Sequence, residues 1–214
     1  MYWKHLTFAS RQNPDTWPGM HTFTDHIRNI RACRLCAERF AVTKTAHRPR
    51  PVVWLSQTAR IMVVGQAPGA RVHASGRPFT DASGDRLRQW MGVDSATFYD
   101  QDKVAIFPMA FCFPGYDAKG SDLPPPKICA DHWRADTLAL MPQVRLTLLV
   151  GGYAQKWHLG AKSMSETVAN WQKYDPYIIP LPHPSWRNTS WLKKNPWFET
   201  DLIPHLRHRV TELL

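Results

Sequence analysis

The sequence is short of carboxylates and lacks any long apolar run. Of its 214 residues, 17 are Asp or Glu and 27 are Lys or Arg, so the formal net charge is +10 with His neutral. No stretch reaches the roughly 18 apolar residues that a transmembrane helix requires, and we expect no membrane association. The first residues also lack the charged-then-apolar layout of a secretory signal, so we expect a cytoplasmic protein.

The cationic excess occurs together with ten Trp. Lys and Arg neutralise phosphates and aromatic rings stack on bases, so this composition favours a nucleic acid partner. A basic soluble enzyme that binds no nucleic acid has a similar composition, and charge alone leaves both readings open.

Cysteine is scarce, and a second CxxC motif is absent. Cys33 and Cys36 form one CxxC, and Cys112 and Cys129 follow far along the chain, separated by 16 residues. A zinc ribbon normally has two CxxC knuckles, which argues against one here. An iron–sulfur cluster accepts one close pair and two distant thiols, because its ligands need only converge in space. Four buried, unligated cysteines are the alternative.

Four short apolar runs predict buried strands, with helical patterns between them. Strands that alternate with helices indicate an α/β fold with a parallel sheet and helices on both faces. We expect residues 1–20 to form a polar amino-terminal extension and residues 21–214 a single domain. The strand runs are 60–65, 103–109, 145–151 and 177–181, and the main helical patterns are 83–92, 125–141, 153–160, 163–172 and 195–214.

Open α/β sheets bind ligands beyond the carboxyl ends of their strands. The loops that follow the first, second and fourth predicted strands therefore meet at one edge of the sheet. This layout places Gln66, Phe79, Cys112 and His183 on the same side of the molecule.

The loop after the first strand contains no Asp or Glu from Gln66 to Phe79. Gly65, Pro68 and Gly69 give it a backbone that can point N–H groups at an anionic or carbonyl oxygen. An ordinary Gly-Pro turn is the alternative. No Gly-Lys-Ser/Thr follows, which excludes a phosphate-binding P-loop.

His183 lies between Pro182 and Pro184, so its backbone is rigid and the direction of its ring is restricted. A rigidly held His suits acid–base or electrophilic work. Cations and aromatics interleave after it, and together they can grip phosphates and wedge between or stack on bases. A structural Pro-His-Pro turn beside buried aromatics is the alternative. The cations are Arg187, Lys193 and Lys194, and the aromatics are Trp186, Trp191, Trp197 and Phe198.

Two carboxylates follow the acid-free loop, at the start of a predicted helix. Asp81 is either the N-cap of this helix or a functional group, and Ser83 is another candidate for the cap. Asp85 suits the positive end of the helix dipole.

These motifs together resemble the uracil-DNA glycosylase superfamily, and most closely its iron–sulfur branch, family four. VGQAPG with GRPFTDASGDRL is similar to the first motif of that branch, and HPS at 183–185 is similar to the second. A CxxC before the first motif and a thiol pair spaced by 16 after it match the branch's cluster ligands. The resemblance runs from about residue 27 to the carboxyl terminus.

The resemblance implies a three-layer α/β/α sandwich around a short, mostly parallel four-stranded sheet. It implies a DNA glycosylase that flips a deaminated base, uracil above all, out of DNA and hydrolyses its N-glycosidic bond. No Lys in the motifs stands out as a Schiff-base nucleophile, so we expect a monofunctional enzyme, and we expect a monomer. The resemblance also implies a 4Fe-4S cluster with a structural role. The resemblance and the residue patterns together give the candidate residues, which are His183, Gln66 and Asp81 for catalysis; Gly65, Ala67, Gly69, Phe79 and Pro108 for the base; Ser185, Trp186, Arg187, Asn188, Lys193 and Lys194 for DNA; and Cys33, Cys36, Cys112 and Cys129 for the cluster.

The sequence departs from the family pattern where carboxylates and an amide are expected. Gln66 stands at the usual Glu of the branch, Ala67 at a water-activating Asp of the best-known branch, and Pro108 at the Asn that reads uracil. Asp81 is our candidate replacement carboxylate, and His73 is a weaker one. A glycosylase for hypoxanthine or xanthine, or a weakened damaged-DNA-binding protein, are the alternative functions.

Overall fold

The computed structural model describes residues 22–214, and its centre is a four-stranded sheet with the order β2-β1-β3-β4. All neighbouring strands are parallel, so each connection crosses back over a face of the sheet. The predicted α/β fold is confirmed, whereas the predicted extension, residues 1–20, lies outside the described residues. The strands are β1 (Ile61–Val64), β2 (Val104–Ile106), β3 (Leu146–Val150) and β4 (Ile178–Leu181).

Helices occupy the segments between and around these strands. The five main helical patterns of the sequence all contain helix, with ends shifted by a few residues. The helices are α1 (Phe23–Ala32), α2 (Ala37–Ala41), α3 (Ala70–Ser75), α4 (Ala82–Met91), α5 (Ser95–Phe98), α6 (Lys127–Ala139), α7 (Gly152–Leu159), α8 (Met164–Ala169), α9 (Thr189–Lys194) and α10 (Ile203–Leu213).

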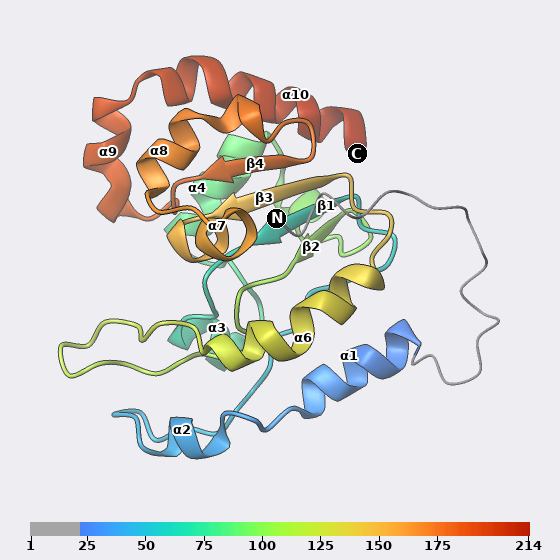
Figure 1. Ribbon diagram of the computed structural model, residues 1–214, viewed down its shortest axis with the longest axis vertical. Coiled ribbons are helices and arrows are strands. Elements are labelled where there is room, and N and C mark those ends of the chain that lie inside the picture. Colours follow the sequence, from blue (N-terminus) through green and yellow to red (C-terminus); the bar gives the residue numbers. More distant parts are fainter. Residues whose placement is uncertain (1–21) are drawn as a thin grey trace.

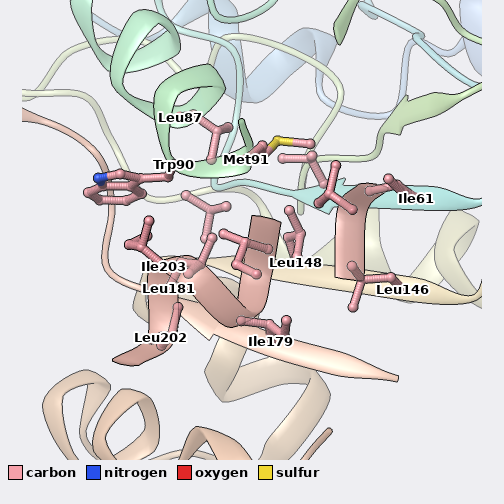
Figure 2. Close-up of a cluster of buried hydrophobic side chains, with 14 of the residues drawn as sticks. Ile61, Leu87, Trp90, Met91, Leu146, Leu148, Ile179, Leu181, Leu202 and Ile203 are labelled. Atoms are coloured by element: carbon pink, nitrogen blue, oxygen red, sulfur yellow. The ribbon is translucent and has the colours of Figure 1, made fainter. Parts of the chain in front are cut away.

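Both faces of the sheet are buried, and successive strand residues alternate between two hydrophobic clusters. Ile61 and Val63 of β1 belong to one cluster, and Met62 and Val64 belong to the other. Figure 2 shows part of the first cluster, where side chains from α4 and from the start of α10 meet those of the strands. Continuous apolar runs of this kind are typical of strands that are covered on both sides.

The two clusters define three layers. The first cluster includes side chains of α4, α8 and α10, and the second includes side chains of α1, α6 and α7. Figure 1 shows α4 and α10 on one side of the sheet and α1 and α6 on the other. The expected α/β/α sandwich is therefore confirmed.

Two short helices form in segments that the sequence predicts to be loops. The α3 helix begins after Gly69 and ends at Gly76, whose φ of 75° is left-handed. Arg50, distant in sequence, donates hydrogen bonds to the carbonyls of His73 and Ala74 at the end of α3. A capping group from so far away leaves no local pattern in the sequence, and α9 lies in the other segment.

The chain also departs from regular α-helix just before α10. The segment Phe198–Leu202 is π-helical and runs directly into α10. Pro204 has no N–H to donate to the carbonyl four residues earlier, which interrupts the normal hydrogen-bond ladder. The π-helical turn therefore lies where Pro204 breaks the ladder.

None of the helices within residues 22–214 is both long enough and apolar enough to cross a bilayer.

Candidate functional site

A cavity of about 270 Å³ lies beyond the carboxyl ends of β1 and β2. Residues from the loop after β1, the start of α4, the loop after β2 and the loop after β4 line it. Several predicted site residues therefore meet here, from segments far apart in the sequence. These predicted lining residues are Gly65, Gln66, Ala67, Gly69, Phe79, Asp81, Pro108 and His183.

The loop after β1 is held by its carbonyl groups. Met109 N–H donates to the Gly65 carbonyl at 2.9 Å, and Ala110 N–H donates to the Gln66 carbonyl at 3.2 Å. Within the described part of the chain, the N–H groups of Gln66, Ala67 and Gly69 have no protein acceptor. These donors are consequently available to a ligand in the cavity.

Phe79 has a strained backbone that its neighbours hold in place. Its φ is +54°, in the left-handed region that a bulky side chain rarely adopts. The Phe79 carbonyl accepts hydrogen bonds from the Tyr99 hydroxyl at 2.8 Å and from Arg88 Nη1 at 3.1 Å. A β-carbon on Gly65 would lie 3.6 Å from the tip of the Phe79 ring, so the ring stands over the start of the loop.

His183 is half-buried, and its ring orientation is fixed. Ser185 N–H donates to Nδ1 at 3.2 Å, so the neutral ring carries its proton on Nε2. Burial lowers the pKa of His183 below 6.5; the Asp81 carboxylate opposes this shift, and the Arg187 guanidinium adds to it. The site therefore favours a neutral His that can donate a hydrogen bond from Nε2.

The two carboxylates at the start of α4 both take helix-terminal roles. Asp81 is the N-cap, and its side chain accepts a hydrogen bond from Gly84 N–H at 3.2 Å. Asp81 also lines the cavity and interacts electrostatically with His183. Asp85 lies in the first turn and forms an ion pair with Arg88 at 2.6 Å.

Pro108 forms part of the cavity wall through a buried, fixed backbone. Its carbonyl accepts a hydrogen bond of 2.6 Å from Arg134, which is 1% exposed. Pro108 has neither a backbone N–H nor a polar side chain, so it offers a base no donor toward the cavity. An arginine of α6 thus fixes the carboxyl end of β2, and the position cannot read a base edge as an amide would.

The segment after His183 is fastened to its surroundings, yet it leaves one aromatic ring free. The Asn188 side chain donates to the His183 carbonyl at 2.7 Å, and Arg86 donates to the Ser185 carbonyl at 3.3 Å. Between these anchors, the Trp186 residue is 77% exposed. The structure thus presents a single exposed ring on a braced loop next to the cavity.

The other aromatics of this segment are structural. Phe198 is fully buried, and Trp191 and Trp197 pack against the same core. The Trp191 indole N–H also donates to Ser165 Oγ at 2.7 Å. Of the four aromatics predicted to contact DNA, only Trp186 is largely exposed. Lys193 and Lys194 are exposed on α9.

Sequence reasoning missed several residues that line the cavity, and four of these have a charged or aromatic side chain. They come from the segment before β1, from α3 and from the loop after β2. Asp122 is the one that adds a carboxylate, and no motif in the sequence distinguishes it from the neighbouring Asp117. The four are Trp54, Arg71, Tyr116 and Asp122.

The four cysteines line a second cavity, which is otherwise apolar. All four are free thiols, and each interacts electrostatically with others of the set. Burial raises the pKa of Cys112 to about 12 and that of Cys129 to about 11. Thiols in such surroundings stay protonated unless a bound metal compensates their charge.

The donor set and its spacing distinguish two kinds of metal centre. Among residues 22–214, no three His, Cys, Asp or Glu side chains lie close enough together to ligate one metal ion. The ligands of a multi-iron cluster can lie farther apart, because each thiolate binds a different iron. Phe111 N–H donates to Cys129 Sγ at 3.5 Å, and the Arg50 backbone N–H interacts with Cys112 and lowers its pKa against the effect of burial. Such N–H···S contacts in an apolar shell suit a cluster.

Comparison with protein families gives one match, to the family described as Uracil DNA glycosylase superfamily, over residues 53–207. The matched range contains the whole sheet and every residue that lines the candidate cavity except Val52. Two of the four cysteines, Cys33 and Cys36, lie before it.

Proposed function

The chain belongs to the uracil-DNA glycosylase superfamily, and we propose that it is a monofunctional DNA glycosylase of base excision repair. Its substrate is a deaminated base in DNA, with uracil as the first candidate. The observation that carries this proposal is the meeting of Phe79, His183 Nε2 and the unpaired N–H groups of 66–69 at one cavity.

A base inside the DNA stack cannot reach such a cavity, so it must be flipped out. Phe79 supplies an aromatic wall for the planar ring, and its backbone hydrogen bonds keep that wall in place. The loop N–H groups and the neutral His183 ring face the same space. These donors suit the carbonyl oxygens of a deaminated base better than the amino group of an undamaged cytosine.

Breaking the N-glycosidic bond leaves negative charge on the base and positive charge on the sugar. A hydrogen bond from His183 Nε2–H to the departing base stabilises that negative charge, as does the dipole of the 65–69 backbone. Among the residues that line the cavity there is no Lys. We therefore propose hydrolysis by water, without a Schiff base and without strand cleavage.

The surroundings of the cavity suit a DNA backbone. The chain carries a net charge of +10, and Arg187, Lys193 and Lys194 lie on the segment that follows His183. Cations at such positions neutralise phosphates, and the exposed Trp186 ring can fill the gap that a flipped base leaves.

We also propose that Cys33, Cys36, Cys112 and Cys129 hold a 4Fe-4S cluster. The shared apolar cavity and the N–H···S contacts support it. When bound, the cluster would cross-link the segment before α2 to the loop after β2 and the start of α6. With one thiolate on each iron, it would offer no open position to a substrate, so its role is structural.

Pro108 favours a second candidate substrate. It cannot form the paired hydrogen bonds by which an amide distinguishes uracil, so hypoxanthine or xanthine is the alternative base. A weakened protein that binds damaged DNA is the other alternative, because the 66–79 loop lacks a carboxylate.

Base release from defined oligonucleotides tests the proposal. The full-length protein is incubated with single- and double-stranded DNA that contains uracil, hypoxanthine or xanthine, and alkali then cleaves the abasic product. We expect cleavage after alkali and none before it. Binding to lesion-containing DNA without release of any of these bases would contradict the enzyme and support the binding protein.

A further inference from the structure

The cavity has a carboxylate that the acid-free loop does not provide. Asp122 belongs to the loop after β2, and its Oδ2 lies 4.0 Å from the point where a β-carbon on Gly69 would stand. It lines the same cavity as Gln66, Phe79 and His183. A side chain from another segment thus reaches the turn that lacks its own acid.

The loop that carries Asp122 is closed by a ladder of its own. Tyr116 and Asp122 form an antiparallel bridge, and Leu123 N–H donates to the Gly115 carbonyl at 2.8 Å. At its tip, the Asp117 carboxylate accepts the N–H groups of Lys119 and Ser121, each at 2.9 Å. The Tyr116 ring packs against Phe113. This bracing fixes where the Asp122 side chain begins.

The Asp122 carboxylate is unengaged within the described part of the chain. It accepts no hydrogen bond there and has no ion pair within 4.0 Å. Asp81 differs, since its carboxylate caps α4 through Gly84 N–H. Of the two acids that line the cavity, Asp122 is the one whose oxygens are open to a water molecule.

We propose that Asp122 orients the attacking water and accepts its proton. The inference rests on the glycosylase activity proposed above. The water oxygen bonds to the anomeric carbon while the glycosidic electron pair leaves with the base. The water proton passes to the Asp122 carboxylate, and the departing base, held by His183, is protonated afterwards by solvent. Atoms and charge balance without a further reactant.

The charges around Asp122 are consistent with a group that accepts a proton from water. Partial burial raises the pKa of the Asp122 carboxyl, and the Arg187 guanidinium opposes that shift. Arg71, Asp81, Tyr116 and His183 are the other titratable groups that line the cavity. A raised pKa makes a carboxylate a better proton acceptor. Arg187 favours the ionised form and lies on the segment that would meet the DNA backbone.

Single variants of the full-length protein separate this role from others. Asp122→Asn keeps the size of the side chain and removes the proposed proton acceptor. Asp81→Asn removes the other carboxylate of the cavity and keeps a residue that can cap α4. Asp136→Asn changes an exposed acid of α6 and serves as the control. Base release is measured under single turnover across pH, and binding is measured with an uncleavable 2′-fluoro uracil oligonucleotide.

We expect Asp122→Asn to slow base release by about 10²–10⁴ and to abolish the fall in rate on the acid side. Binding should be unchanged or tighter, because a negative charge leaves the DNA-facing surface. Asp81→Asn should lose less of the rate of base release, and Asp136→Asn should release the base at the wild-type rate. Asp122→Ala should regain rate when formate is added, since a small carboxylate can occupy the vacated space.

A wild-type rate in Asp122→Asn would overturn the inference, as would an equal loss of rate and binding that formate does not restore. Either result leaves the glycosylase proposal intact, because the wild type is assayed in parallel. A wild type that releases no deaminated base would instead overturn both.

Discussion

Gly84 packs so closely on Phe79 that a β-carbon there would lie 1.9 Å from the Phe79 carbonyl oxygen and 2.6 Å from the carbonyl carbon. The first turns of α4 and the strained residue that walls the cavity are therefore in direct backbone contact. Only a glycine permits this approach, which makes the wall of the cavity dependent on a residue that never touches a ligand.

Gly84→Ala should damage both the fold and the site. The clash is with backbone, so α4 or Phe79 must move, and overpacking of this kind costs about 1–3 kcal/mol. We expect a lower midpoint of urea unfolding and weaker base release. Gly152→Ala is the matched control, because no heavy atom lies within 4 Å of its would-be β-carbon. Equal midpoints for the two variants would contradict the packing argument.

His183→Ala should slow base release by about 10²–10⁴ and leave DNA binding nearly unchanged. The reason is that Nε2–H acts on charge that develops only as the bond breaks. His183 has a lowered pKa, so its neutral form persists below pH 6.5. The contribution of His183, measured as the ratio of wild-type to variant rates, should therefore hold as the pH falls just below 6.5. A ratio that collapses there would show that the ring is protonated.

Trp186→Ala should weaken action on double-stranded DNA more than on single-stranded DNA. A wedge is needed only where a flipped base leaves a gap in a duplex. Because Trp186 is 77% exposed, the substitution should not change unfolding. Tyr177→Ala, another exposed aromatic at 63%, lies at the amino end of β4 and should behave as wild type on both substrates. Equal losses of activity on single- and double-stranded DNA would show that Trp186 contributes to DNA affinity in general and does not act as a wedge.

The sheet could be predicted from the sequence because buried parallel strands are nearly continuous apolar runs. Each of β1 to β4 is buried throughout, so its pattern survives without help from distant residues. The layout of the site followed from the same pattern, since the loops after parallel strands share one edge.

The missed features depend on contacts between distant segments. Arg50 caps α3 from outside that helix, and Asp122 brings its carboxylate to within 4.0 Å of the β-carbon position of Gly69. Trp191 is structural because Ser165 accepts its N–H. None of these partners lies within one helical turn or hairpin of its target, so spacing in the sequence could not reveal them.

His158 makes stability depend on pH. Burial and the adjacent Arg134 guanidinium lower the pKa of His158 to about 3. As the pH falls through about 6.5, the unfolded state binds a proton at this ring and the folded state does not. The contribution to stability is therefore full above that pH and falls below it. Between pH 7 and pH 5, wild type should lose about 2 kcal/mol more unfolding free energy than His158→Gln, which does not titrate. Parallel losses would show that His158 is not held neutral.

Cys112→Ser should remove the proposed cluster, and with it the connection between α2 and the loop after β2. The purified wild type should be brown, absorb broadly near about 400 nm and carry about four iron and four sulfide per chain. The variant should be colourless and less stable. Ala110→Ser is the matched control, because it puts the same hydroxyl into the cavity that the thiols line and keeps all four of them. A wild type that carries stoichiometric zinc and no iron would contradict the cluster, even with glycosylase activity present. Because the thiols share a cavity without converging on one point, iron and sulfide together are the expected result.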